Sequence, residues 1–168
     1  GPDEPGLERA AAILRSGGVV ALPTETVYGL AARADCAEAV AKIYEAKGRP
    51  SYNPLIVHVH SLEQGRTLAK FNADALELAA DHWPGPLTLV LPRRRDAILA
   101  DAIAAGLPTI ALRCPAHAVM RRVIELVDAP LAAPSANRSG FVSPTTADHV
   151  LATLDGRIDA VVDGGPTE

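Results

Sequence analysis

The chain has 168 residues, of which 48% are hydrophobic and only 4% are aromatic. This length suits one domain whose core is built from small apolar side chains. The formal net charge of −4 argues against a general nucleic-acid coat, because such proteins normally carry a basic excess.

Neither a membrane span nor a secretory signal is indicated by the sequence. No apolar run approaches the roughly eighteen residues that a transmembrane helix needs. Residues 1–5 have neither the basic start nor the apolar stretch of a signal peptide. We therefore expect a cytoplasmic protein in which Cys36 and Cys114 are small buried thiols rather than a disulfide.

Apolar periodicity and turn residues predict strands that alternate irregularly with helices. This order favours an α/β fold with a sheet of mixed direction. Capping patterns predict helix starts at Asp35, Ser61 and Asn72. The expected helices are residues 7–15, 36–47, 62–70, 73–82, 117–127 and 147–154, and the expected strands are 18–22, 55–59, 86–91, 109–113, 131–133 and 159–163.

Residues 23–30, Pro-Thr-Glu-Thr-Val-Tyr-Gly-Leu, form the first of three segments that are richer in polar groups than packing requires. They directly follow an expected buried strand, and ligands in open α/β sheets bind at the carboxyl ends of strands. The alternative is a polar turn in which Thr24 or Thr26 caps a helix. Position alone leaves both interpretations open.

Residues 47–55 form the second segment, in which Lys47 and Arg49 flank a glycine. Two cations beside a stiff loop make a good phosphate clamp, because arginine offers a planar fork and lysine a mobile point charge. The alternative is that both cations merely complement the dipole at a helix end.

Residues 133–140, followed by Ser143, form the third segment. Small residues with successive backbone N–H groups and hydroxyls can wrap an anion or a nucleotide, although ordinary loops share this composition. The chain has no Walker A sequence and no G-x-G-x-x-G sequence, so neither a P-loop nor a dinucleotide site is indicated. Residues 93–95 are three arginines that fit a solvated turn or a tRNA contact.

Together these segments resemble the YrdC-type threonylcarbamoyl-adenylate synthase family. The resemblance extends from about Val19 to the end of the chain. Its motifs are PTETVYGL at 23–30, KGRP at 47–50, NPL at 53–55, His58, WPGPLTLVL at 83–91, Thr109, the Arg-Cys-Pro of 113–115, APSANRSG at 133–140 and SPT at 143–145.

The resemblance implies a twisted mixed-direction sheet flanked by helices around a deep central cavity. It also implies a nucleotidyltransferase that converts L-threonine, bicarbonate and ATP into threonylcarbamoyl-AMP and pyrophosphate. The product would pass to a tRNA threonylcarbamoyl transferase complex for N6-threonylcarbamoyladenosine modification of tRNA. A weak contact with tRNA is a further expectation.

The resemblance also implies roles for individual residues. Lys47 and Arg49 would stabilise phosphoryl charge, with no protein nucleophile, and Mg²⁺ would be held mainly by ATP rather than by the protein. L-Threonine would be held by Thr26, His58, Arg113 and Ala133, and ATP by Lys47, Arg49, Asn53, Thr109, Ser135, Asn137 and Ser143.

Members of this family usually continue beyond the segment that residues 164–168 represent. We therefore expect residues 1–168 to be a single YrdC-like catalytic domain that lacks the family's C-terminal end. The rival hypothesis is a non-catalytic RNA-binding or nucleotide-binding regulatory module of the same fold. Salt-sensitive tRNA binding without ATP, or ATP binding without turnover, would distinguish these modules from an enzyme.

Overall fold

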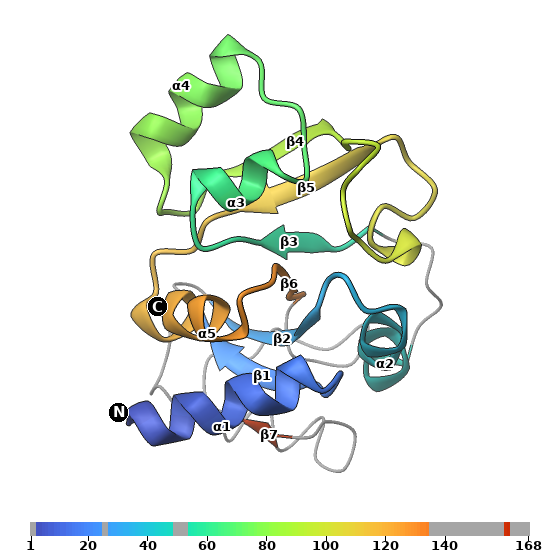
Figure 1. The fold of residues 1–168 in the computed structure, drawn as a ribbon, viewed down its shortest axis with the longest axis vertical. Coiled ribbons are helices and arrows are strands. Elements are labelled where there is room, and N and C mark those ends of the chain that lie inside the picture. Colours follow the sequence, from blue (N-terminus) through green and yellow to red (C-terminus); the bar gives the residue numbers. More distant parts are fainter. Residues whose placement is uncertain (1–2, 25–26, 49–53, 135–159, 162–168) are drawn as a thin grey trace.

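In the computed structural model, the described residues 3–24, 27–48, 54–134 and 160–161 form a seven-stranded sheet flanked by helices (Figure 1). The strands are β1 (Val20–Pro23), β2 (Tyr28–Arg33), β3 (Ile56–His58), β4 (Thr88–Pro92), β5 (Thr109–Arg113), β6 (Leu131–Ala132) and β7 (Ala160–Val161). The helices are α1 (Glu4–Arg15), α2 (Ala37–Lys47), α3 (Leu62–Arg66), α4 (Ala73–His82), α5 (Ala118–Val127) and the short 3₁₀ helix η1 (Asp101–Ile103).

The sheet is of mixed direction, as predicted. Its strand order is β4-β5-β3-β6-β2-β1-β7. Strand β3 pairs in parallel with β5, and β1 with β7, whereas the other neighbouring strands are antiparallel. The expected strand at 159–163 is observed as β7, and the expected helix at 147–154 lies outside the described residues.

Helices cover both faces of the sheet, because successive side chains of a strand point to opposite faces. On the α1 face, α1 and α5 lie side by side and pack on β1, β2 and β6 (Figure 1). This face is formed by Val20, Leu22, Ala31 and Leu131. The opposite face, called the α2 face, is formed by Ala21, Leu30, Ala32, Val57 and Leu112, and α2 packs against it.

Strand β2 was not predicted, although it lies near the middle of the sheet. Its sequence, Tyr-Gly-Leu-Ala-Ala-Arg, is buried from Tyr28 to Ala32. A strand buried on both faces lacks the alternation of apolar and polar residues that identifies a strand in sequence. Its glycine and alanines also have weak strand propensity. The segment therefore looked like a continuation of the polar motif before it.

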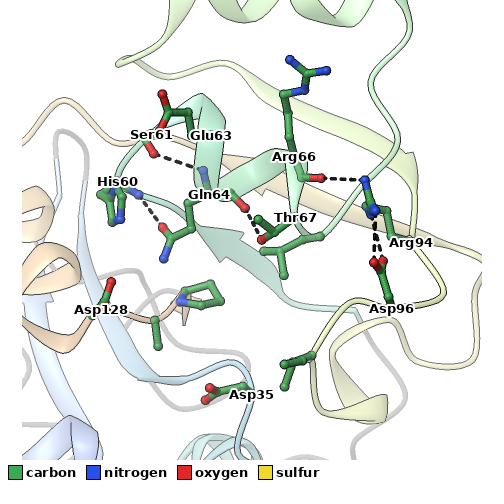
Figure 2. A pocket seen from close by; sticks show the side chains of 14 residues that line it. Asp35, His60, Ser61, Glu63, Gln64, Arg66, Thr67, Arg94, Asp96 and Asp128 are labelled. Atoms are coloured by element: carbon green, nitrogen blue, oxygen red, sulfur yellow. Dashed lines mark hydrogen bonds and ion pairs between the residues drawn. The ribbon is translucent and has the colours of Figure 1, made fainter.

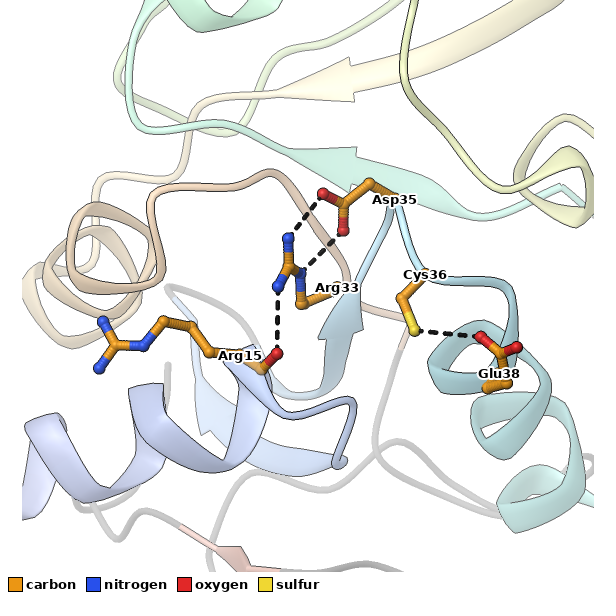
Figure 3. A network of polar contacts seen from close by, with 5 residues as sticks. All are labelled: Arg15, Arg33, Asp35, Cys36 and Glu38. Carbon is orange, nitrogen blue, oxygen red and sulfur yellow. Dashed lines mark hydrogen bonds and ion pairs between the residues drawn. The ribbon is translucent and has the colours of Figure 1, made fainter.

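The predicted helix start at Asp35 is wrong. The N-cap position of α2 is Cys36, whose side chain makes no capping hydrogen bond. The Asp35 carboxylate instead accepts hydrogen bonds from Arg33 at 2.9 and 2.8 Å, and these raise the pKa of Arg33 above its ordinary value. Arg33 also donates to the Arg15 carbonyl at 3.0 Å, so it joins the end of α1 to the end of β2 (Figure 3).

Neither cysteine forms a disulfide, as expected, but only one of them is buried. Cys114 is 3% exposed. Cys36 is half-buried, and its thiol lies 3.5 Å from a Glu38 carboxylate oxygen (Figure 3). The expectation of two buried thiols is therefore wrong for Cys36, because the turn before α2 leaves this position at the protein surface.

Helix α3 is shorter than predicted. It ends at Arg66, and Ala69 then forms an antiparallel bridge with Arg93. The Lys70 amide donates to the Pro92 carbonyl at 2.9 Å. The Leu68 carbonyl likewise accepts from the Arg94 amide at 2.9 Å. The backbone after α3 thus bonds to the chain at the end of β4 instead of extending the helix, which local periodicity does not reveal.

The helix caps predicted at Ser61 and Asn72 are confirmed. The Ser61 hydroxyl accepts from the Gln64 amide at 3.1 Å, and the Asn72 side-chain oxygen accepts from the Ala75 amide at 2.8 Å. Each cap satisfies an N–H group that a helix start leaves without an intrahelical partner.

We expect Asn72→Ala to lower the free energy of unfolding by about 1 kcal/mol, because the Ala75 amide loses its acceptor. Urea denaturation measures this change. Asn72→Asp is the matched control, since it keeps a side-chain acceptor and should retain most of the stability. Equal unfolding midpoints for Asn72→Ala and the unaltered chain would contradict the prediction.

Candidate functional site

His58 and Arg113 lie next to each other at the ends of the parallel strands β3 and β5. The two residues are paired directly in the register, so their side chains project from the same face of the sheet. His58 is also paired with Leu131, which places this face on the α1 side. His58 is 3% exposed and Arg113 is half-buried. The structure thus brings together two of the residues assigned to L-threonine.

Thr109 lies on the same face of β5 as Arg113, because an even number of residues separates them. Four residues of an extended strand span about 13 Å. This face stays accessible where α1 and α5 do not reach, since Ile56 on β3 and Val90 on β4 are 37% and 64% exposed. An elongated ligand lying along β5 would therefore contact both Thr109 and Arg113.

Ala133, the third described residue among those assigned to L-threonine, follows β6. Its amide lies 3.3 Å from the Ile56 carbonyl, two residues before His58. Ala133 packs with the α1-face residues and is 8% exposed. Its backbone is therefore on the side of the sheet that carries His58 and Arg113.

Gly29 brings the first and third polar segments together. The amide of the next residue, Leu30, donates to the Pro134 carbonyl at 2.7 Å. A Cβ atom at Gly29 would lie 3.4 Å from the Ala133 Cβ and 3.6 Å from the Pro134 oxygen. Only a residue without a large side chain allows this approach.

Gly29→Val is expected to lower the free energy of unfolding by about 1–3 kcal/mol, because its methyl groups would force β2 away from Ala133. Gly29→Ala is the matched control, since its single methyl group would make ordinary van der Waals contacts. Urea denaturation of both variants measures the difference. The prediction fails if the valine variant is as stable as the alanine variant.

Thr24 closes the turn between β1 and β2. Its hydroxyl donates to the Val27 carbonyl at 2.6 Å and accepts from the Val27 amide at 3.3 Å. The polar turn of the alternative interpretation is therefore present. Its helix cap at Thr24 is wrong, because β2 follows the turn. Thr26 lies outside the described residues.

Lys47 is the last residue of α2 and is only 3% exposed. Gly48 ends the helix in the left-handed conformation with φ of 67°. Lysine is rarely so buried, and a side chain that only complemented the helix dipole would keep its ammonium in water. The burial of Lys47 therefore argues against an ammonium that only complements the helix dipole in solvent, and the phosphate-clamp role stays a prediction.

The remaining residues assigned from the sequence are outside the described part of the chain. They are Thr26, Arg49, Asn53, Ser135, Asn137 and Ser143. Among the described residues, no group of three or more His, Cys, Asp or Glu side chains could hold a metal ion.

A separate pocket of about 680 Å³ contains none of the assigned residues. It is lined mainly by α3 and the loops around it, including His60, Gln64, Arg66 and Arg94 (Figure 2). Gln64 is hydrogen-bonded to the His60 amide, and Arg94 to Asp96. These polar groups hold the loops together and are separate from the pair His58 and Arg113.

The arginines at 93–95 take part in local structure. Arg93 donates to the Leu99 carbonyl at 3.1 Å, and Arg94 forms a double hydrogen bond with Asp96 at 2.9 and 3.0 Å. These contacts favour the solvated-turn interpretation for Arg93 and Arg94 over a tRNA contact.

Sequence reasoning gave no role to Gly85, although it noted the motif that contains it. The Gly85 carbonyl accepts from the Arg113 Nε at 3.3 Å, and the Gly85 amide donates to the Cys114 carbonyl at 2.8 Å. The available signal was a glycine between two prolines, which indicates a tight turn with a special backbone requirement.

Comparisons with known proteins show the family and the fold of this chain. A family model described as "Telomere recombination" (Sua5, YciO and YrdC) matches residues 12–168. A threonylcarbamoyl-AMP synthase of Bacillus subtilis is 52% identical over 166 residues, which cover 98% of this chain and 48% of the relative. The chain therefore spans about half the length of this relative.

Solved structures show the same architecture. The crystal structure of Pyrococcus abyssi Sua5 complexed with L-threonine is 50% identical with a TM-score of 0.94, over 98% of this chain and 48% of that one. Escherichia coli YciO, at 20% identity and a TM-score of 0.87, covers 100% of this chain and 82% of its own, and supports the fold alone. No helix in the described ranges is long and apolar enough to cross a membrane. With the family model matching nearly the whole chain, this protein belongs to the Sua5, YciO and YrdC family.

Proposed function

We propose that this chain is an L-threonylcarbamoyladenylate synthase, which makes threonylcarbamoyl-AMP and pyrophosphate from L-threonine, bicarbonate and ATP. The observation that carries the proposal is the placement of His58 and Arg113 side by side at the ends of β3 and β5. It is supported by the 50% identity to a Sua5 protein whose crystal structure contains L-threonine.

In this proposal, Arg113 binds the carboxylate of L-threonine. A guanidinium pairs with a carboxylate through two parallel hydrogen bonds, which fix both distance and orientation. His58, the backbone of Ala133 and Thr26 complete the threonine site. His58 itself is only 3% exposed, so its imidazole is held in place by packing.

ATP would extend from this point toward Lys47 and Thr109. The side chains of Arg49, Asn53, Ser135, Asn137 and Ser143 are assigned to the same nucleotide site. Because Thr109 and Arg113 share one face of β5, the nucleotide and L-threonine would lie along the same strand.

The chemistry needs no protein nucleophile. The threonine amine and bicarbonate form a carbamate with loss of water, and a carbamate oxygen then attacks the α-phosphorus of ATP. The bond to the bridging oxygen breaks, and pyrophosphate leaves with that electron pair. Lys47 and Arg49 would stabilise the charge that develops on the phosphoryl oxygens. Mg²⁺ would enter with the triphosphate and neutralise part of its charge.

The product would serve a tRNA threonylcarbamoyl transferase complex in the cytoplasm, and a weak contact with tRNA remains part of the proposal. The acidic net charge favours a local over an extended nucleic-acid surface.

The proposal is tested by measuring pyrophosphate release with ATP and Mg²⁺, while L-threonine and bicarbonate are omitted in turn. We expect release only when both are present, and we expect a chelator of Mg²⁺ to abolish it reversibly. ATP binding without release would support a nucleotide-binding regulator instead. Salt-sensitive tRNA binding without ATP and without release would support an RNA-binding module.

A further inference from the structure

Gly85 contacts the end of β5 through both its backbone N–H group and its backbone carbonyl oxygen. Its amide donates to the Cys114 carbonyl at 2.8 Å, just beyond the strand. Its carbonyl accepts from the Nε of Arg113 at 3.3 Å. One backbone residue therefore contacts both the main chain after Arg113 and the guanidinium itself.

This position has no room for a side chain. A Cβ atom at Gly85 would collide with the backbone carbonyl oxygen of His82. His82 is the last residue of α4, and its backbone carbonyl cannot move aside as a flexible side chain could. Any residue larger than glycine at position 85 must therefore displace the turn itself. Displacing the turn also displaces the carbonyl that contacts Arg113.

The turn of residues 83–87 is also held by contacts that do not involve the Arg113 side chain. The indole N–H of Trp83 donates to the Leu87 carbonyl at 2.8 Å, which closes the turn. The Trp83 ring packs edge-on against Phe71, with ring centroids 6.0 Å apart and planes at 78°. Strand β4 then begins at Thr88, which is paired directly with Arg113. The Arg113 guanidinium therefore donates to a turn whose backbone is held in place by hydrogen bonding and ring packing.

We propose that the turn of residues 83–87 orients Arg113 for the carboxylate of L-threonine, and that Gly85 is the positioning residue of this turn. This inference rests on the proposed function, which assigns Arg113 to that carboxylate. A two-bond pairing requires the guanidinium plane to be aligned within roughly 10–20°. The hydrogen bond from the Arg113 Nε to the Gly85 carbonyl orients the guanidinium plane. The turn thereby contributes to the affinity for L-threonine without contacting it.

The test is calorimetric titration of L-threonine and of ATP into the unaltered chain, Gly85→Ala, Arg113→Lys and the double variant. Gly85→Ala is expected to weaken threonine binding about tenfold while ATP affinity changes less than about twofold. In the Arg113→Lys background, which lacks the Nε donor, Gly85→Ala should add less than about a twofold loss.

Trp83→Phe provides a second variant if Gly85→Ala does not fold. It removes the N–H bond to Leu87 and keeps an aromatic ring against Phe71. We expect a smaller loss of threonine affinity, again with ATP affinity retained. Gly17→Ala is the control, because it strains a left-handed glycine (φ of 92°) in the turn between α1 and β1. It should lower stability and leave threonine affinity unchanged.

Equal losses for both ligands, or losses that multiply in the double variant, would show a general structural role and overturn the inference. Threonine binding that neither Gly85→Ala nor Trp83→Phe alters would overturn it while leaving the proposed function intact. Failure of the unaltered chain to bind L-threonine would overturn the proposed function together with this assignment.

Discussion

Replacing Arg113 by alanine is expected to lower kcat/KM for L-threonine about a thousandfold, or ~4 kcal/mol, because two charge-assisted hydrogen bonds are lost. Arg113 projects from the accessible part of the α1 face beside His58, so the substitution opens no large cavity in the core. Pyrophosphate release at varied L-threonine, with ATP and bicarbonate saturating, measures the change.

Arg113→Lys separates charge from geometry in this experiment. Lysine keeps the positive charge but offers no planar fork, so we expect a loss intermediate between the unaltered chain and Arg113→Ala. Thermal unfolding of each variant checks that the chain remains folded. An increase in the KM for ATP as large as that for L-threonine would contradict the assignment of Arg113 to the carboxylate.

Lys47→Met is expected to lower kcat about a hundredfold, because the transition state loses a cation positioned for the developing phosphoryl charge. Methionine has a similar length, so it fills most of the buried space that the lysine stem occupies. The KM for L-threonine should change less than about threefold, since Lys47 is assigned to the nucleotide. Single-turnover pyrophosphate release gives the chemical rate.

Lys42→Met is the matched control on the same helix. Lys42 is exposed, and its ammonium donates to the Gly17 carbonyl at 3.1 Å, away from the assigned site. It should leave kcat unchanged within about twofold, because a surface cation of this kind contributes little. If both lysine variants lose kcat equally, or if Lys47→Met loses only stability, the proposed role of Lys47 is wrong.

Local patterns predicted most of the helices and several strands correctly. The side-chain caps at Ser61 and Asn72 were visible because capping depends on residues only three apart. Strand β5 was predicted with its observed bounds, since its apolar and half-buried positions alternate. The cap at Asp35 failed because the carboxylate pairs with Arg33 instead, a competition between two local partners that spacing cannot resolve.

The motifs also identified the family, because side chains that contact substrates are constrained in type and order along the chain. The family model agrees over residues 12–168. The substrate roles of all the assigned residues stay predictions. The structure also gives no placement for six of them, which lie outside its described part: Thr26, Arg49, Asn53, Ser135, Asn137 and Ser143.

Local patterns and motifs were thus sufficient to predict the fold class, two of the side-chain helix caps and the family. The folded structure was needed to show that β2 is a buried strand and that His58 is paired with Arg113. It also showed that Lys47 is buried and that Gly85 supports Arg113. The physical reason is range: caps and periodicity depend on neighbours along the chain, whereas strand register, burial and backbone contacts depend on segments brought together by folding.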